Sequence, residues 1–178
     1  MVRVIIRTYP LMYCMSSLNI EVVKIRPKDG VNVILGQSHF IKTVEDLFNA
    51  LSESVPGIKF GVAFCESSGK RLIRHAGTDE GLEKDAVELC KRIGCGHCFV
   101  ILLGNAFPIN VIPRIKEVSE VVTLYCATAN PIEVVIGVTG QGRCILGVVD
   151  GYPPLGVEGG EDKKERKEFL VKIKYRED

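Results

Sequence analysis

Two cysteines and a histidine make up the most conspicuous chemical motif of the sequence, the box Cys95-Gly-His-Cys98. The spacing is that of a dithiol–disulfide active site, where the first cysteine follows a strand and opens a helix whose dipole stabilises the thiolate. In this sequence Gly94 ends a predicted helix and Cys98 begins a predicted buried strand. The box therefore lies in a helix-to-strand turn, and this context argues against a redox enzyme.

A zinc site built from the same segment is also disfavoured. Its ligands would be Cys90, Cys95, His97 and Cys98, and their C-x4-C-x-H-C spacing is not an established tetrahedral framework. A strand beginning at Cys98 would direct this side chain away from His97, because successive side chains of a strand point to opposite faces. The sequence therefore predicts no metal site.

His39 occupies a second place suited to chemistry, after a predicted strand and just ahead of a predicted helix. Lys42 and the hydroxyl of Thr43 are near it in sequence, and the N–H groups at a helix N-terminus attract anions. An imidazole and an ammonium there could act on a phosphoryl group as nucleophile and electrostatic clamp. The alternative is that His39 only hydrogen-bonds its loop, and residue chemistry alone leaves both interpretations open.

The usual nucleotide motifs are absent. A P-loop would need Ser or Thr where Arg71 follows Gly69-Lys70, and a dinucleotide fingerprint would need glycine at Ile145. Several other polar residues fit structural roles by themselves: His97 as a structural histidine, His75 in a surface loop, Asp79 as a helix cap and Asp150 in a turn.

The periodicity of apolar residues predicts an alternation of strands and helices. Residues 20–25 and 31–35 predict an antiparallel hairpin, and Thr43 begins a helix with a loose capping box. The remaining predictions are a strand at 58–64 followed by a loop, a helix at 80–93, a strand at 98–103, a helix at 108–118, a strand at 121–126, a hairpin of 132–139 with 144–149, and a charged helix at 162–169.

This pattern predicts one α/β domain with a mixed sheet covered by helices, a size that suits 178 residues. Ligands of open α/β sheets bind beyond the carboxyl ends of the strands. The polar, glycine-rich segments that follow the strands, and where a site is expected, are 36–43, 65–69, 104–110 and 127–130.

Composition narrows the class of protein. The net charge of +1 gives no signal for a nucleic acid partner, and no run approaches the ~20 apolar residues that span a bilayer. Seven cysteines, mostly in apolar runs, predict reduced thiols and a cytoplasmic protein. Residues 1–18 are interpreted as an N-terminal extension, with Met15 as an alternative start, and residues 19–178 as the domain.

Six segments taken together resemble the adenosine-specific kinase family, found in archaea and thermophilic bacteria. They are VILGQSHFIKTVEDL, VPGIKFGVAFCESSG, IGCGHCFVI, FPINVIPRIKEV, LYCATANPIEVVI and GRCILGVVDGYPPLGVE. The similarity covers about residues 20–175. It implies a three-layer αβα sandwich, a homo-oligomer, adenosine or AMP as the ligand, and a histidine that can carry phosphate.

The resemblance also changes the interpretation of the cysteine box. The family segment reads Gly-x-Gly-His, so Gly94, Gly96 and His97 are the pattern and the two cysteines are incidental. His97 thereby becomes a candidate phosphoryl acceptor beside His39. Strand polarity favours His39, because His97 is expected at the opposite end of its strand.

Two classes of function follow. The first is a phosphoryl transferase acting on adenosine or AMP, whose cofactor the sequence leaves open, with Mg²⁺ a candidate if transfer occurs. The second is a non-catalytic adenosine or AMP binding or sensing protein. His39, His97 and Lys42 are the candidate catalytic residues. The candidate ligand-binding residues are Gln37, Ser38, Thr43, Glu66, Ser67, Asp79, Asn110, Thr128, Asn130, Arg143 and Asp150.

Overall fold

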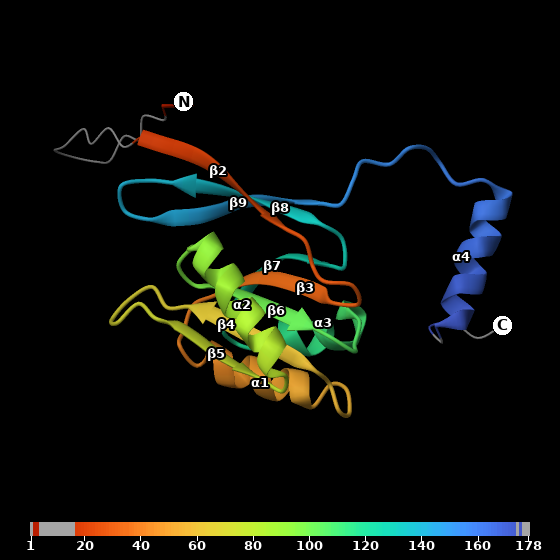
Figure 1. Cartoon of the computed structure of the whole chain (residues 1–178), viewed down its shortest axis with the longest axis horizontal. Helices are drawn as coiled ribbons and strands as arrows, with labels where there is room; N and C mark the ends of the chain where they lie inside the picture. Colours follow the sequence, from red (N-terminus) through yellow and green to blue (C-terminus); the bar gives the residue numbers. More distant parts are fainter. Residues whose placement is uncertain (1, 4–16, 174, 176–178) are drawn as a thin grey trace.

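The computed structural model describes residues 2–3, 17–173 and 175 (Figure 1). The predicted N-terminal extension falls largely outside this range. The elements in chain order are β1 (Val2–Arg3), β2 (Ser17–Ile25), β3 (Asn32–Ser38), α1 (Thr43–Ser52), β4 (Phe60–Cys65), β5 (Ile73–Gly77), α2 (Glu80–Ile93), β6 (Cys98–Leu103), α3 (Pro108–Glu117), β7 (Val121–Thr128), β8 (Ile132–Val138), β9 (Arg143–Asp150) and α4 (Gly160–Lys172).

The strands form two sheets, and every pairing in them is antiparallel. One sheet has the order β5-β4-β6-β3-β7, and the other has the order β1-β2-β8-β9. The neighbouring strands of both sheets run in opposite directions. The predicted single mixed sheet was therefore wrong, while the α/β class and the hairpin of β8 with β9 are confirmed.

A strand that the sequence did not reveal explains the error. β5 forms a hairpin with β4, in a segment expected to be a loop that carries His75. Without β5, the order strand-helix-strand predicts a parallel crossover from β4 through α2 to β6. Because β5 reverses the chain first, β6 enters between β3 and β4 antiparallel to both.

The first predicted hairpin was also wrong. Residues 26–30 do make a turn, with the Val31 amide donating to the carbonyl of Lys28 and Gly30 at φ +76°. The turn moves the chain from one sheet to the other, so β2 pairs with β8 and β3 pairs with β6 and β7. An alternation of apolar and polar residues predicts a strand, but it does not predict which other strand will pair with it.

Three layers result from how the apolar faces are covered. Helices α1 and α3 cover one face of the five-stranded sheet around a cluster that includes Leu47, Phe60 and Ile115. Helix α2 and the smaller sheet cover the other face around a cluster that includes Val100 and Ile136 (Figure 1). Helix α4 has no buried residue and stands apart from the sheets. None of the helices in the described residues is long and apolar enough to cross a membrane.

Candidate functional site

The antiparallel pairing of β3 with β6 brings His39 and His97 to the same edge of the large sheet. Gln37 pairs with Cys98, and the Ser38 amide donates to the His97 carbonyl at 3.0 Å. The expectation that His97 lies at the opposite end from His39 was therefore wrong. It assumed parallel strands, whose carboxyl ends share an edge, whereas in an antiparallel pair the end of one strand meets the start of the next.

His97 is held in an unusual backbone conformation. Its φ of +61° lies in the left-handed region, which residues other than glycine adopt rarely and at a cost of about 1 kcal/mol. The amide of His97 donates to the Cys65 carbonyl at 2.7 Å, and its ring stacks on Phe64 with centroids 5.8 Å apart and planes 9° apart. The ring is thus half-buried and oriented on the α1 side of the sheet.

The start of α1 lies beside this histidine, although Thr43 does not cap the helix as predicted. The N-cap position is Lys42, which makes no capping hydrogen bond with its side chain. The Thr43 hydroxyl instead bonds the Phe40 carbonyl and the Ser38 hydroxyl, the latter at 2.9 Å, and is fully buried. Thr43 therefore fixes the loop that carries the exposed His39.

Lys42 is paired with one carboxylate at this edge and feels the charge of a second. Its ammonium lies 2.9 Å from Asp46, whose hydrogen bond and charge raise the pKa of Lys42, and the charge of Glu120 adds to the effect. Glu120 itself is 5% exposed, and its Oε2 has no hydrogen-bond partner among the described residues. Glu120 precedes Val121, which pairs with Ser38. No sequence signal distinguished this carboxylate from an ordinary surface residue.

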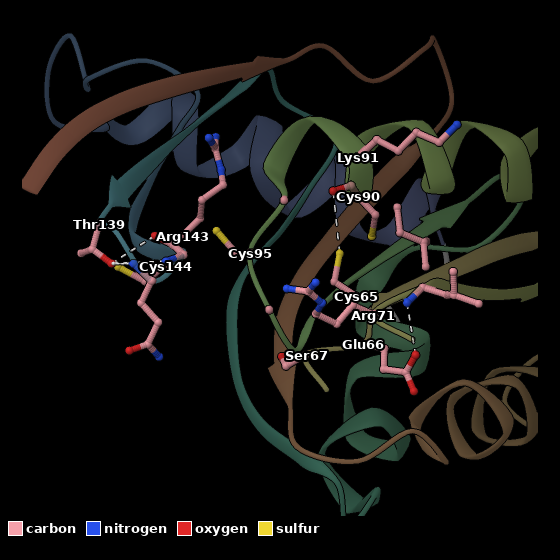
Figure 2. Close-up of a pocket in the computed structure, with 16 residues that line it drawn as sticks. Cys65, Glu66, Ser67, Arg71, Cys90, Lys91, Cys95, Thr139, Arg143 and Cys144 are labelled. Atoms are coloured by element: carbon pink, nitrogen blue, oxygen red, sulfur yellow. Dashed lines mark hydrogen bonds between the residues drawn. The ribbon is translucent and has the colours of Figure 1, made fainter. Parts of the chain in front are cut away.

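A cleft of about 650 Å³ opens at the same edge on the α2 side of the sheet. One wall is the β4–β5 loop with Glu66, Ser67 and Arg71, and the floor includes the α2–β6 turn. The opposite wall is the β8–β9 turn with its flanking residues Thr139, Gln141, Arg143 and Cys144. Figure 2 shows these two groups on either side of Cys95. The volume of the cleft lies in the range of small-molecule binding sites.

Glycines in the α2–β6 turn allow the walls to come close. Gly94 ends α2 at φ +61°, which is the predicted left-handed cap. A Cβ on Gly96 would come within 2.5 Å of the Ser67 hydroxyl. The Gly-x-Gly-His pattern thus has a physical reason at each glycine, because one needs a positive φ and the other makes a close approach.

The charged side chains of the cleft are not equally free. Arg143 donates to the Ile93 carbonyl at 2.9 Å and pairs with Glu21 at 2.9 Å. The Glu66 carboxylate accepts hydrogen bonds from the Leu72 amide and from the Arg74 guanidinium. These bonds, the first most strongly, lower the pKa of Glu66. Arg71, which the sequence interpretation did not select, forms no ion pair with another described residue. Arg71 is therefore the cation of the cleft available to an anionic ligand.

Gln37 belongs to the same edge but faces the interior between the two sheets. Its Oε1 accepts a hydrogen bond of 2.8 Å from the Tyr125 hydroxyl. The pKa of Tyr125 is raised, chiefly by burial, so this hydroxyl stays protonated and remains a donor. Gln37 therefore supports the sheet edge and keeps its amide N–H groups available.

Five of the predicted ligand-binding residues lie at the opposite edge of the sheet. Thr128 pairs with Val33 near the start of β3, about 17 Å from the end of that strand at ~3.3 Å per residue. The Asn110 side chain accepts from the Phe107 amide, Thr128 accepts from the Asn130 amide, and Asn130 donates to Asp150. Asp79 caps α2 by accepting from the amides of Gly81 and Leu82. These five are separated from the cleft, and each already has a structural hydrogen bond.

Substitution of Asp79 tests its structural role. Asp79→Ala is expected to lower the free energy of unfolding by about 1 kcal/mol, because two amides at the start of α2 lose their acceptor. The affinity for adenosine, the ligand that the family resemblance implies, is expected to stay unchanged. Urea denaturation and calorimetry on the same samples measure both, with Asp79→Asn as the control that keeps a capping oxygen. A large loss of affinity in both variants would place Asp79 in the ligand site instead.

The cysteine box is not a dithiol pair. Cys95 is buried, its thiol faces the Ile93 carbonyl, and burial raises its pKa to about 11, whereas a redox nucleophile needs a lowered pKa. Cys98 turns toward Cys65 on the α2 side, while His97 lies on the other side. The context predicted from the sequence is confirmed, since α2 ends at Ile93 and β6 begins at Cys98.

Replacing Cys95 separates the redox interpretation from the others. Cys95→Ser is expected to change adenosine affinity by less than about twofold and to cost on the order of 1 kcal/mol of stability, because a serine hydroxyl can bond the Ile93 carbonyl. Calorimetry and thermal unfolding measure the two effects. Complete loss of function in a folded Cys95→Ser protein would restore the dithiol hypothesis.

Comparison with known proteins places the chain in a family. The model of the family described as adenosine specific kinase matches residues 23–176. The chain is also similar to the crystal structure of the PH1918 protein from Pyrococcus horikoshii OT3, with 46% identity and a TM-score of 0.86 over 91% of this chain and 100% of that one. No functionally curated protein matches. The chain therefore belongs to the adenosine-specific kinase family.

Proposed function

We propose that this protein binds adenosine or AMP in the cleft and transfers a phosphoryl group through His97. The ring would take the terminal phosphoryl group of ATP or ADP, releasing the shortened nucleotide, and pass it to the 5′-hydroxyl of adenosine to give AMP. The observation that carries the proposal is the meeting, at one sheet edge, of a cleft with an unpaired arginine and a conformationally constrained histidine. Family membership supports adenosine as the substrate class. The ring of His97 lies on the α1 side and outside the cleft lining, and the segment from Gly94 to His97 connects it to the floor of the cleft.

Hydroxyl and amide groups of the cleft are suited to the nucleoside. Thr139, Gln141 and Ser67 line opposite walls and can donate to or accept from ribose and adenine. Arg71 provides a guanidinium for phosphate oxygens, which it can contact with two parallel hydrogen bonds. Arg143 holds the α2–β6 turn to the small sheet, so its role in the proposal is to position the cleft rather than to neutralise phosphate.

His97 is preferred to His39 as the phosphoryl acceptor. Its ring is fixed by Phe64, and the cost of its backbone conformation indicates a position retained for a reason other than stability. A nucleophile must be held in line with phosphorus, and an oriented ring lowers the entropic cost of reaching that geometry. His39 is exposed and would serve, with Lys42 and the Ser38 hydroxyl, to stabilise charge near the start of α1.

Protein-bound Mg²⁺ has no place in this proposal. The cation takes carboxylate oxygens, and the three acidic residues among the predicted ligand-binding residues are engaged elsewhere. Glu66 is bound by Arg74, Asp79 caps α2, and Asp150 accepts from Asn130. No phosphoryl step is therefore assigned to a metal held by these residues.

Non-catalytic binding is the second candidate function. It is favoured by the absence of a triphosphate-binding motif and by the pairing of Arg143 and Glu66 with other protein groups.

The homo-oligomer implied by the family resemblance also stays a prediction, which sedimentation equilibrium would measure.

Calorimetric titration with adenosine, AMP, ADP and ATP tests the binding part of the proposal. Adenosine and AMP are expected to bind more tightly than ATP and ADP, the donors, because Arg71 is the one cleft cation without an ion pair among the described residues and the sequence contains no P-loop. Transfer of labelled phosphate then separates the enzyme from the binding protein. Binding without any transfer from either ATP or ADP would support the second function, and binding of no nucleoside would reject both.

A further inference from the structure

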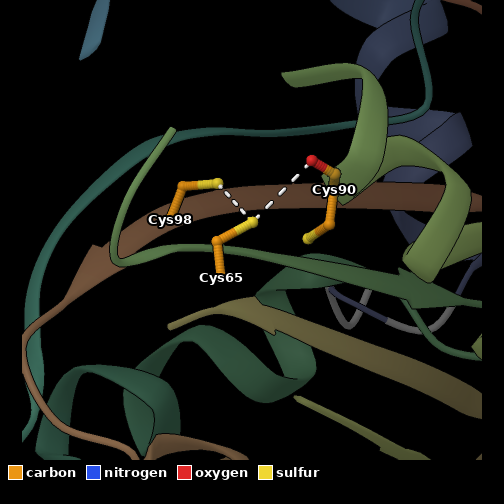
Figure 3. A group of neighbouring side chains, drawn as sticks. All are labelled: Cys65, Cys90 and Cys98. Atoms are coloured by element: carbon orange, nitrogen blue, oxygen red, sulfur yellow. Dashed lines mark hydrogen bonds between the residues drawn. The ribbon is translucent and has the colours of Figure 1, made fainter. Parts of the chain in front are cut away.

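Three buried thiols from three different elements lie together, as Figure 3 shows, and two of them also line the cleft. Cys65 ends β4, Cys90 lies in the last turn of α2, and Cys98 begins β6. Their sulfur atoms all lie within 4.8 Å of one another, and the Sγ atoms of Cys65 and Cys98 are 3.6 Å apart. The exposed fractions are 8%, 0% and 1% for Cys65, Cys90 and Cys98.

The pairing of β4 with β6 and the packing of α2 over both strands bring these thiols together. Phe64 pairs with Phe99, which brings the end of β4 beside the start of β6 and places Cys65 near Cys98. Helix α2 packs over both strands on this face, and its buried row ends at Cys90 and Ile93. The three sulfurs are thus held by regular elements rather than by a loop, which is the rigidity that a metal site needs.

The spacing suits a tetrahedral ion with thiolate ligands. Zinc–sulfur bonds of about 2.3 Å place tetrahedral sulfurs about 3.8 Å apart, close to the separation of Cys65 from Cys98. Soft thiolates select d¹⁰ cations over Mg²⁺ or Ca²⁺. No other His, Cys, Asp or Glu of the described residues joins the group, so three protein ligands leave one coordination position unfilled.

That position can be reached from the cleft. Cys65 and Cys90 belong to the cleft lining as well as to the thiol cluster, and Figure 2 shows both within the cleft wall. Arg71, Lys91 and Arg143 line the same cleft. Three thiolates with one Zn²⁺ carry a net charge of −1, which Arg71 can offset, because Lys91 and Arg143 are already paired with Glu88 and Glu21. A monovalent Cu⁺ would leave −2 in a buried site, at a greater cost in desolvation.

We infer that Cys65, Cys90 and Cys98 form a three-thiolate zinc site whose fourth position faces the cleft and takes a water molecule or a donor atom of a bound ligand. Zn²⁺ displaces the protons of the thiols as it binds, so no oxidation or reduction takes place. The site shares Cys90 and Cys98 with the zinc framework that the sequence disfavoured. It has Cys65 as its third ligand and does not use Cys95 or His97. It is independent of the proposed phosphoryl transfer.

Metal titration of the full-length, reduced and chelator-treated protein tests this site. We expect one Cd²⁺ or Zn²⁺ per chain, with a Cd²⁺–thiolate charge-transfer band in the ultraviolet. Cys98→Ser is expected to lower the affinity ~100-fold or more, since a lost ligand costs more than a lost second-layer contact. Cys144→Ser is the matched control, because Cys144 lines the same cleft, is exposed, and lies outside the cluster.

A measurement on the unmodified protein guards against misfolded variants. X-ray absorption of the zinc-loaded protein is expected to show three sulfur ligands at about 2.3 Å and one oxygen or nitrogen ligand. The inference is overturned if the fully reduced protein binds no zinc, if fewer than three sulfurs bind it, or if Cys144→Ser weakens binding as much as Cys98→Ser. Isolation of a Cys65–Cys98 disulfide that reforms in preference to zinc binding would also overturn it.

Discussion

His97→Asn is expected to abolish phosphate incorporation into the protein, with a loss on the order of 10⁴-fold or more, as for the removal of a nucleophile from other enzymes. The ring nitrogen is the only group that this substitution removes from the proposed transfer. Asparagine is suited to the position, because it tolerates the left-handed φ of +61° better than most residues do. The variant therefore tests chemistry without disturbing the α2–β6 turn.

Two readouts make this prediction specific. Incubation with labelled ATP or ADP, each with adenosine, measures acid-labile phosphate on the protein, and calorimetry measures adenosine affinity, which is expected to change by less than about twofold. His39→Asn is the control for a histidine at the same edge, and it is expected to slow transfer without removing the labelled site. If His39→Asn abolishes the label and His97→Asn keeps it, the assignment is reversed.

Arg71→Ala is expected to weaken AMP binding about 10- to 100-fold and to leave adenosine binding unchanged. The guanidinium of Arg71 is the cleft cation that has no ion pair with the residues the structure describes, and a hydrogen bond to a charged group contributes about 1.5–3 kcal/mol. The substitution keeps a Cβ at a residue whose φ is +52°, so the backbone strain is the same in both proteins. The discrimination between AMP and adenosine should therefore disappear.

Lys70→Ala is the matched control for Arg71→Ala. Lys70 is the neighbouring exposed cation, and it lies outside the cleft lining. It is expected to alter AMP affinity by less than about twofold, and raising the salt concentration should weaken AMP binding in the Lys70 variant but not in the Arg71 variant. Equal losses in both variants would indicate a diffuse attraction to the loop rather than a phosphate contact at Arg71.

Much of the local structure was predictable from the sequence, but the pairing of strands was not. The bounds of α2 and β6 follow from apolar periodicity and from the glycine after Ile93, and both are confirmed. β5 was missed because its five residues, Ile-Arg-His-Ala-Gly, are only partly buried and do not alternate clearly. This one short strand sets the direction of β6, so its omission produced the wrong sheet and the wrong location for His97.

The candidate site was predictable only in part for the same reason. Loops after strands were expected to share one edge, but antiparallel strands distribute them between two, which separates Asn110 and Thr128 from Ser67. Arg71 and Glu120 carry no motif, and their significance comes from an open cleft and from burial without a partner. The thiols of Cys65 and Cys98 are distant in sequence, and only the pairing of β4 with β6 brings them together.

A crystal structure of the protein with AMP tests the central claim most directly, namely that the ligand binds at the edge shared by the cleft and the two histidines. The account predicts the nucleoside between the β4–β5 loop and the β8–β9 turn, with the phosphate on Arg71 and directed past Gly96 toward His97. AMP bound at the opposite edge, among Asn110, Thr128 and Asn130, would contradict it.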